Sequence, residues 1–76
     1  PQAVAYRDGM TVLDAVLAAG GLTQYAAGNR ARIVRMVDGR EKDIPVRLSA
    51  LVNSGDMSQN LPLKPGDVVV VPESRF

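Results

Sequence analysis

Apolar residues dominate one stretch of the chain, positions 12–19, and polar or glycine residues mark both of its ends. Thr11 can cap free backbone N–H groups with its hydroxyl, and Asp14 completes a capping box and brings negative charge to the positive end of the helix dipole. Gly20 or Gly21 can take the left-handed conformation that ends a helix. The pattern predicts a helix of about 9 residues, far too short to span a membrane.

The apolar positions of this helix cover more than one stripe, and its alanines would let a sheet approach closely. We therefore expect a mostly buried core helix. A large-to-small change such as Leu17→Ala is then expected to cost about 2–5 kcal/mol. Before the helix, residues 3–7 predict a short strand, because the turn residues Asp8 and Gly9 separate the two elements.

A hairpin is predicted after the helix, with strands over 30–37 and 40–48. Between them stands Asp38-Gly39, a dipeptide that suits a two-residue type I′ turn. The resulting facing pairs are Val37 with Arg40, Ile33 with Ile44, Ala31 with Val46, and the like-charged Arg35 with Lys42. This register directs the apolar residues toward the helix. Pro45 is typical of an edge strand, because it has no N–H to donate.

The last third of the chain alternates polar and apolar stretches. Residues 49–52 can form one helical turn, and 53–60 predict a polar loop. Pro65-Gly66 fits the centre of a type II turn. The four valines 68–71 are apolar at both parities, which predicts a central strand buried on both faces. One helix and a mixed sheet packed on it define an α+β domain.

Length and composition exclude several classes of function. The 76 residues form a single small domain, 1–76, and the absence of cysteine and histidine excludes disulfides, imidazole catalysis and the common zinc sites. A net charge of +1 gives no bias toward nucleic acid or anionic lipid. The chain opens without an initiating methionine or a signal peptide, so we expect a fragment of a longer protein.

Catalysis and metal binding have little support in the residues. A general base near neutral pH would have to be a tuned carboxylate. The aspartates stand instead at predicted turns, caps and solvent-facing strand positions, namely Asp8, Asp14, Asp38, Asp43 and Asp67. The loop 53–60 lacks the regular acidic spacing of a calcium loop. We expect no enzyme activity, no metal and no cofactor.

One group of residues suits a binding role. Asn29, Arg30 and Arg32, with Tyr25 nearby in sequence, offer hydrogen-bond donors and a ring that can stack on a sugar or an acidic polymer. Arg30 and Arg32 share one face of the predicted strand, while Arg35 points to the other. The alternative is a plain solvated sheet face, and it stays open because isolated surface charges are common.

Four motifs in this order are similar to those of a known family. They are Gly9-Met10-Thr11-Val12-Leu13-Asp14-Ala15-Val16, Ala19-Gly20-Gly21-Leu22-Thr23, Ala27-Gly28-Asn29-Arg30-Ala31 and Leu63-Lys64-Pro65-Gly66-Asp67-Val68-Val69-Val70-Val71-Pro72. Together they resemble the SLBB domain, the soluble-ligand-binding β-grasp. The run from Val71 to Phe76 is similar to the end of such segments in bacterial outer-membrane polysaccharide export proteins, especially those of exopolysaccharide loci.

The resemblance implies a β-grasp, ubiquitin-like fold and a periplasmic location, associated with the outer membrane through the parent protein. It implies a non-enzymatic part of an oligomeric export channel. Its partners would be other copies or domains of the export protein and the transported polysaccharide, with no nucleic acid and no membrane insertion. In the family an additional strand precedes the position of Pro1, so we expect that strand to be missing and a sheet edge to be open.

An alternative function is a soluble-ligand receptor, in which the same fold binds a sugar or another small molecule tightly. Tight binding would need a concave pocket with converging polar groups, whereas a scaffold can be convex.

Overall fold

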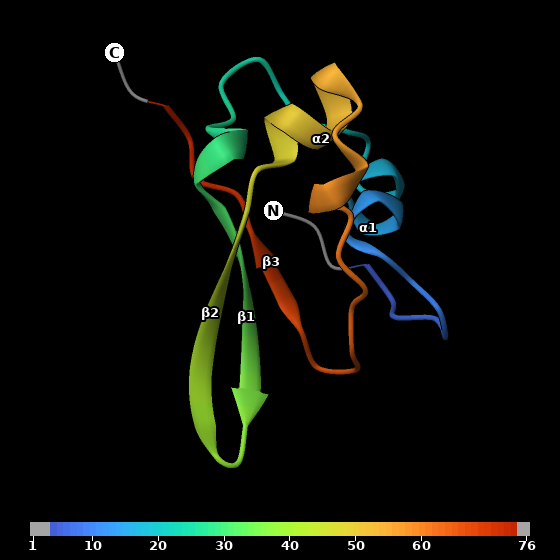
Figure 1. Cartoon of the computed structure of the whole chain (residues 1–76), viewed down its shortest axis with the longest axis vertical. Coiled ribbons are helices and arrows are strands. Elements are labelled where there is room, and N and C mark those ends of the chain that lie inside the picture. The colour runs from blue at the N-terminus through green and yellow to red at the C-terminus, as the bar shows by residue number, and fades with distance from the viewer. Residues whose placement is uncertain (1–3, 75–76) are drawn as a thin grey trace.

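The computed structural model describes residues 4–74 as a small sheet with helices on one face and at one end (Figure 1). The elements are α1 (Val12–Ala18), η1 (Gly28–Arg30), β1 (Ala31–Val37), β2 (Arg40–Val46), α2 (Leu48–Ser54), η2 (Met57–Gln59) and β3 (Val68–Val70). The strand order is β2-β1-β3, and both pairings are antiparallel where a mixed sheet was expected. The architecture is α+β and β-grasp-like, as predicted.

The ends of α1 are those that the sequence predicted. Thr11 Oγ1 accepts a hydrogen bond from the backbone N–H of Asp14, and Asp14 Oδ2 accepts one from the N–H of Thr11, which completes the capping box. Gly20 and Gly21 adopt φ values of +97° and +88° and donate their N–H groups to carbonyls of the last turn. This Schellman ending satisfies carbonyls that would otherwise lack a partner.

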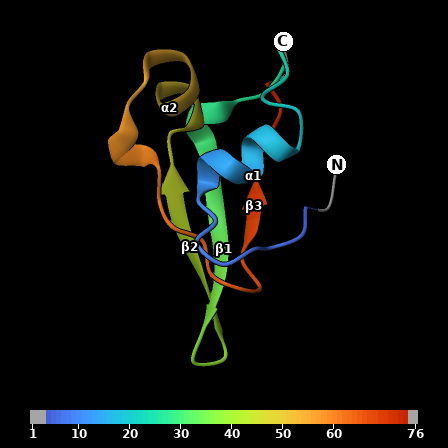
Figure 2. The same cartoon turned by 90° about the vertical axis from the view of Figure 1, so that its right-hand side faces the viewer.

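The prediction that α1 is mostly buried was wrong for part of its surface. Val12 and Val16 are 0% and 6% exposed, but Leu17 is 61% exposed. Figure 2 shows α1 lying against one face of the sheet. Leu17 follows Val16 by one position, about 100° around the helix, and so points away from the sheet. No described helix is long and apolar enough to cross a membrane.

The hairpin has the predicted register, but its strands are shorter than predicted, because Arg30 lies in η1 and Leu48 begins α2. All four predicted facing pairs occur, from Val37 with Arg40 at the tip to Ala31 with Val46 at the base. Asp38 and Gly39 have φ values of +51° and +78°, as a type I′ turn requires. The buried side chains of both strands face α1. Together with buried residues of α1, α2 and the chain before β3, they form one core. Its members are Val12, Val16, Ala31, Ile33, Val46, Leu48, Leu51 and Leu63.

β3 lies at the edge of the described sheet, and the prediction of a central, doubly buried strand was wrong. β1 is the central strand, since it pairs with β2 on one side and β3 on the other. Val69 and Val71 pack against the core, but Val68 is 56% exposed. Within the described residues no layer covers the outward face of β3 at Val68. Four apolar residues in a row therefore did not mean burial on both faces. The turn before it is confirmed: Gly66 has φ +88°.

Two other predicted segments differ. Residues 4–7 form no strand, and residue 3 lies outside the described part of the chain. The predicted helical turn is longer than expected, because α2 continues to Ser54 before Gly55 ends it in the left-handed conformation. The predicted polar loop therefore contains the end of α2 and the whole of η2. Asn60 in this segment has a structural role, because its Oδ1 accepts the N–H of Leu13, at 3.0 Å.

Candidate functional site

The four predicted binding residues come from one region, the approach to β1. Tyr25 lies in the loop before η1, Asn29 and Arg30 are in η1, and Arg32 is in β1. The loop is held against the chain after β3, because Ala27 donates its N–H to the Pro72 carbonyl and Ser74 donates its N–H to the Tyr25 carbonyl, both at 2.7 Å. The two chain segments thus continue the line of the β1–β3 pairing beyond η1.

Gly28 allows η1 to pack against α2. Gly28 is buried, and a Cβ added there would lie 2.9 Å from the backbone nitrogen of Ser49 and also against its Oγ. Contacts this short to a backbone atom cannot be relieved by a side-chain rotation. A residue without a side chain is therefore required where η1 meets the start of α2.

Asn29 has a structural contact that the sequence did not predict. Its Oδ1 accepts the backbone N–H of Ala50 at 3.1 Å. Ala50 lies in the first turn of α2, where backbone N–H groups have no partner within the helix. Asn29 therefore caps α2 from a distant position, and its amide oxygen is engaged.

Arg30 and Tyr25 are exposed, whereas Arg32 is half-buried. The exposed fraction of Tyr25 is 62%. Arg32 Nε lies 3.5 Å from Asp43 Oδ2, with side chains that are 43% and 61% exposed. That Nε atom is itself shielded and has no hydrogen bond of good geometry. Arg32 is thus loosely paired rather than fixed.

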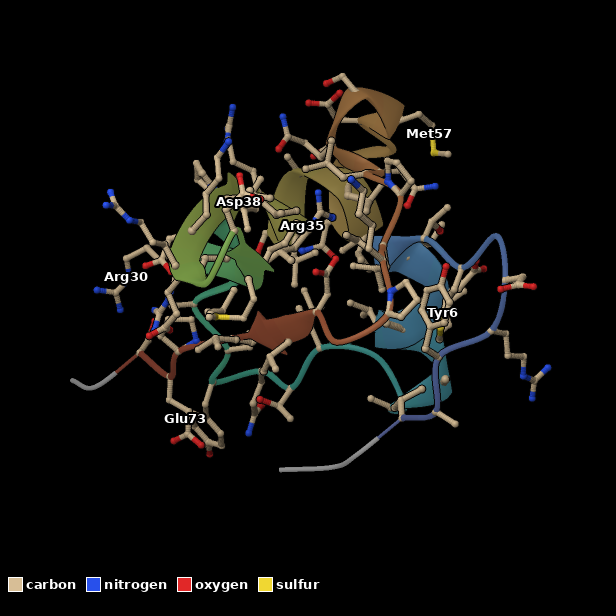
Figure 3. The ribbon with its side chains drawn as sticks, turned by 90° about the horizontal axis from the view of Figure 1, so that it is seen from below. Tyr6, Arg30, Arg35, Asp38, Met57 and Glu73 are labelled. Carbon is tan, nitrogen blue, oxygen red and sulfur yellow. The ribbon has the colours of Figure 1, made fainter. Side chains whose placement is uncertain are left out.

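The outer face of the sheet is the face opposite α1. Ala31 and Ile33 point into the core, so the alternate residues of β1 point outward, starting with Arg32. The pairing partners of those residues share this face. It is formed by Arg32, Val34, Met36, Glu41, Asp43, Pro45, Val68 and Val70. Figure 3 shows Arg30 extending on this side of the sheet, away from α1.

Arg35 points to the other face, as predicted, and binds Asp67. Nη2 of Arg35 lies 2.7 Å from Oδ2, and Nε lies 3.0 Å from Oδ1. These hydrogen bonds lower the pKa of Asp67, and the hydrogen bond from the Lys64 N–H lowers it further, against the opposing effect of burial. The same hydrogen bonds raise the pKa of Arg35. This pair serves the fold, since both charges are already neutralised.

An apolar groove runs between α1 and β3, and Val4 and Tyr6 of the N-terminal segment also line it. Its volume is about 440 Å³. Ala15 of α1 and Ala19 at its C-cap form one wall, and Val69 and Val71 form part of the other. Asp67 is the one carboxylate in the lining, and Arg35 already binds it. The groove is therefore concave and apolar, and its described lining has no unpaired charged side chain.

The described residues contain no cluster of side chains suited to a metal ion. No group of three or more His, Cys, Asp or Glu residues within 4–74 could hold a metal ion. In the region considered for calcium, Asp56 Oδ1 instead accepts the N–H of Ser58 at 3.2 Å.

A model of the SLBB domain family matches residues 1–71, nearly the full length of the sequence. The chain belongs to the SLBB domain family. SLBB domains are a family of binding modules and not a known family of enzymes. The motifs that carried the resemblance have structural positions: Gly9–Val16 begins α1, and Leu63–Pro72 forms the turn and the strand β3.

This SLBB domain has one more exposed cation beside the predicted residues. Arg47 follows Val46, the last residue of β2, while Arg30 precedes Ala31, the partner of Val46. Arg30 and Arg47 therefore flank the same residue pair. The sequence prediction did not include Arg47 in the binding group, although the predicted strands 30–37 and 40–48 already set it opposite Arg30.

Proposed function

We propose that this SLBB domain is a non-enzymatic, periplasmic module of an outer-membrane polysaccharide export protein, and that it joins copies of that protein in an oligomeric channel. The free edge of β3 is the observation that carries this proposal. In the described sheet, β3 pairs with β1 on one side only. A free edge presents unpaired backbone N–H and C=O groups that a further strand can bind.

The two edges of the sheet differ in their protection. β2 forms one edge, and it carries alternating charges over Arg40–Asp43 followed by Pro45. Charges and proline are the features that discourage strand addition. The other edge, residues 68–71, has neither a charge nor a proline. This contrast supports β3 as the edge that another strand covers.

The groove beside β3 supports the same proposal. Side chains of an added strand would lie over the apolar walls formed by Ala15, Ala19 and Val71. A contact through one short strand buries much less than the roughly 1,200 Å² of a stable complex. The association of two isolated chains should therefore be weak, and a closed ring would strengthen it through many simultaneous contacts.

Single cysteine variants test this proposal, because the chain has no cysteine of its own. Val68→Cys places a thiol on β3, and Met36→Cys is the matched control, since Met36 is 60% exposed on the same face but on β1. We expect disulfide-linked dimers to form faster for Val68→Cys, at a rate that rises with protein concentration. Equal rates for both variants, with a monomer by sedimentation at every concentration, would contradict the proposal.

A second candidate function is a receptor for a small soluble ligand, supported by the same groove. Its volume lies within the range of small-molecule sites, about 300–1,000 Å³. A saturable titration with a monosaccharide that shifts the amide NMR signals of Ala15 and Ala19 would favour this function. The shifts should then weaken in Ala19→Leu, which fills the groove.

A further inference from the structure

We propose that the polymer which this domain contacts is acidic, a polysaccharide bearing carboxylate groups, and that Arg30, Arg32 and Arg47 bind it on the outer face of the sheet. This inference rests on the proposed role in polysaccharide export and names its ligand class. It combines two predicted residues, Arg30 and Arg32, with Arg47, which only the hairpin register brings to the same end of the sheet.

The three guanidinium groups belong to one end of the hairpin. Arg32 faces outward from β1 opposite Pro45. Arg30 and Arg47 flank the neighbouring pair, Ala31 and Val46, whose side chains are buried on the core side. Figure 3 shows the Arg30 side chain extending away from α1 on this outer side. The positions thus form a short row at the base of the hairpin, with Arg30 in η1, Arg32 in β1 and Arg47 at the N-cap of α2.

The charges of this row are not balanced within the described residues. Arg32 has Asp43 at 3.5 Å, whereas Arg30 and Arg47 form no ion pair with a described residue. Glu73 is exposed but points in a different direction from Arg30 in Figure 3. A bound anion would balance these charges, and guanidinium groups match the planar geometry of carboxylates.

The surroundings of the row suit a sugar rather than a bare anion. Tyr25 is 62% exposed, and its backbone is fixed to Ser74 beside η1. An exposed, amphipathic ring of this kind can stack on the apolar face of a sugar. Val70 is paired with Arg32 in the β1–β3 register and adds uncharged surface to the same face. Asn29 is left out of the proposed site, because its oxygen caps α2.

Titration of the full chain with two oligosaccharides of equal length tests the inference. The acidic probe is oligogalacturonate and the neutral probe is a maltooligosaccharide. We expect only oligogalacturonate to shift the amide NMR signals of Arg30, Arg32 and Tyr25 in a saturable way, with an affinity that falls as NaCl concentration rises. Equal binding of both probes, or binding to neither, would overturn the inference. Tighter binding of a single-stranded DNA oligomer would also overturn it.

Matched charge variants distinguish binding at a specific site from an effect of the net charge of the protein. Arg30→Gln/Arg32→Gln/Arg47→Gln should weaken oligogalacturonate binding by about tenfold or more. Arg7→Gln/Arg40→Gln/Lys42→Gln removes the same charge from other exposed positions and should change it far less. Similar losses in both variants would overturn the site. The Val68→Cys cross-linking experiment is independent of this titration, so a failure of either proposal is recognised separately.

Discussion

Arg35 and Asp67 join the hairpin to the turn before β3. Nη2 of Arg35 lies 2.7 Å from Oδ2 of Asp67, and Asp67 also accepts the N–H of Lys64 at 2.8 Å. The sequence predicted an unfavourable facing pair between Arg35 and Lys42, and the register of that pair is confirmed. The charge of Arg35 is nevertheless satisfied, because its side chain binds Asp67. The ion pair therefore explains how the predicted register is tolerated.

Replacing Asp67 should destabilise the fold. The side chains of Arg35 and Asp67 are 18% and 3% exposed, so Asp67→Asn leaves a mostly buried guanidinium without its carboxylate. We expect the free energy of unfolding, measured in urea, to fall by about 1–3 kcal/mol. Asp43→Asn is the matched control, since that carboxylate is 61% exposed, and it should change stability by less than about 1 kcal/mol. Equal effects would contradict a special role for the Arg35–Asp67 pair.

The same pair predicts a dependence of stability on pH. Hydrogen bonds from Arg35 hold the pKa of Asp67 below its ordinary value of 3.8. The unfolded chain therefore binds a proton at Asp67 more readily than the folded chain does. The contribution of Asp67 is present above pH 3.8 and is lost as pH falls through the lower folded value. Urea unfolding across this range should show that Asp67→Asn lacks this part of the acid destabilisation. An identical pH profile in both proteins would contradict the prediction.

Neighbouring positions of α1 should respond very differently to truncation. Val16 is 6% exposed in the core, whereas Leu17 is 61% exposed. We expect Val16→Ala to lower the free energy of unfolding by about 2 kcal/mol, because it removes buried apolar surface and leaves a cavity. Leu17→Ala should change it by less than about 0.5 kcal/mol. A larger loss for Leu17→Ala would show that another surface covers this side of the helix.

Asn29 should act through α2 rather than through a ligand. Asn29→Ala removes the acceptor of the Ala50 N–H, and we expect it to cost about 1 kcal/mol of stability in urea unfolding. Asn29→Asp keeps an acceptor oxygen at the same position and should retain most of that stability. If Asn29→Ala leaves stability unchanged while it weakens oligogalacturonate binding, the assignment as a cap is wrong.

Local signals in the sequence were sufficient for much of the fold. The capping box of Thr11 and Asp14 and the turn at Asp38-Gly39 depend on residues within a few positions of each other, and both were predicted correctly. The exposure of Leu17 and Val68 was not, because it depends on which layers cover α1 and β3. A run of apolar residues shows which side chains could be buried, but the packing of the other elements determines which of them are.

The candidate site was likewise predicted only in part. The sequence predicted that Arg30 and Arg32 lie on one face and Arg35 on the other. Side chains alternate between the two faces of a strand, and this rule placed Arg32 and Arg35 of β1 correctly. The contact of Asn29 spans 21 residues to Ala50, and no local pattern announces it. Arg47 was within reach of the hairpin register but was omitted. Ligand binding at these residues stays a prediction.

Hydrogen exchange of the β3 amides tests the central proposal most directly. The exchange rates of residues 68–71 would be measured by NMR in the intact chain at increasing protein concentration. If copies associate through the free edge of β3, the amides that point away from β1 should become slower to exchange as concentration rises, while amides of the hairpin tip at Asp38 and Gly39 stay unchanged. Exchange at β3 that is independent of concentration would contradict assembly through this edge.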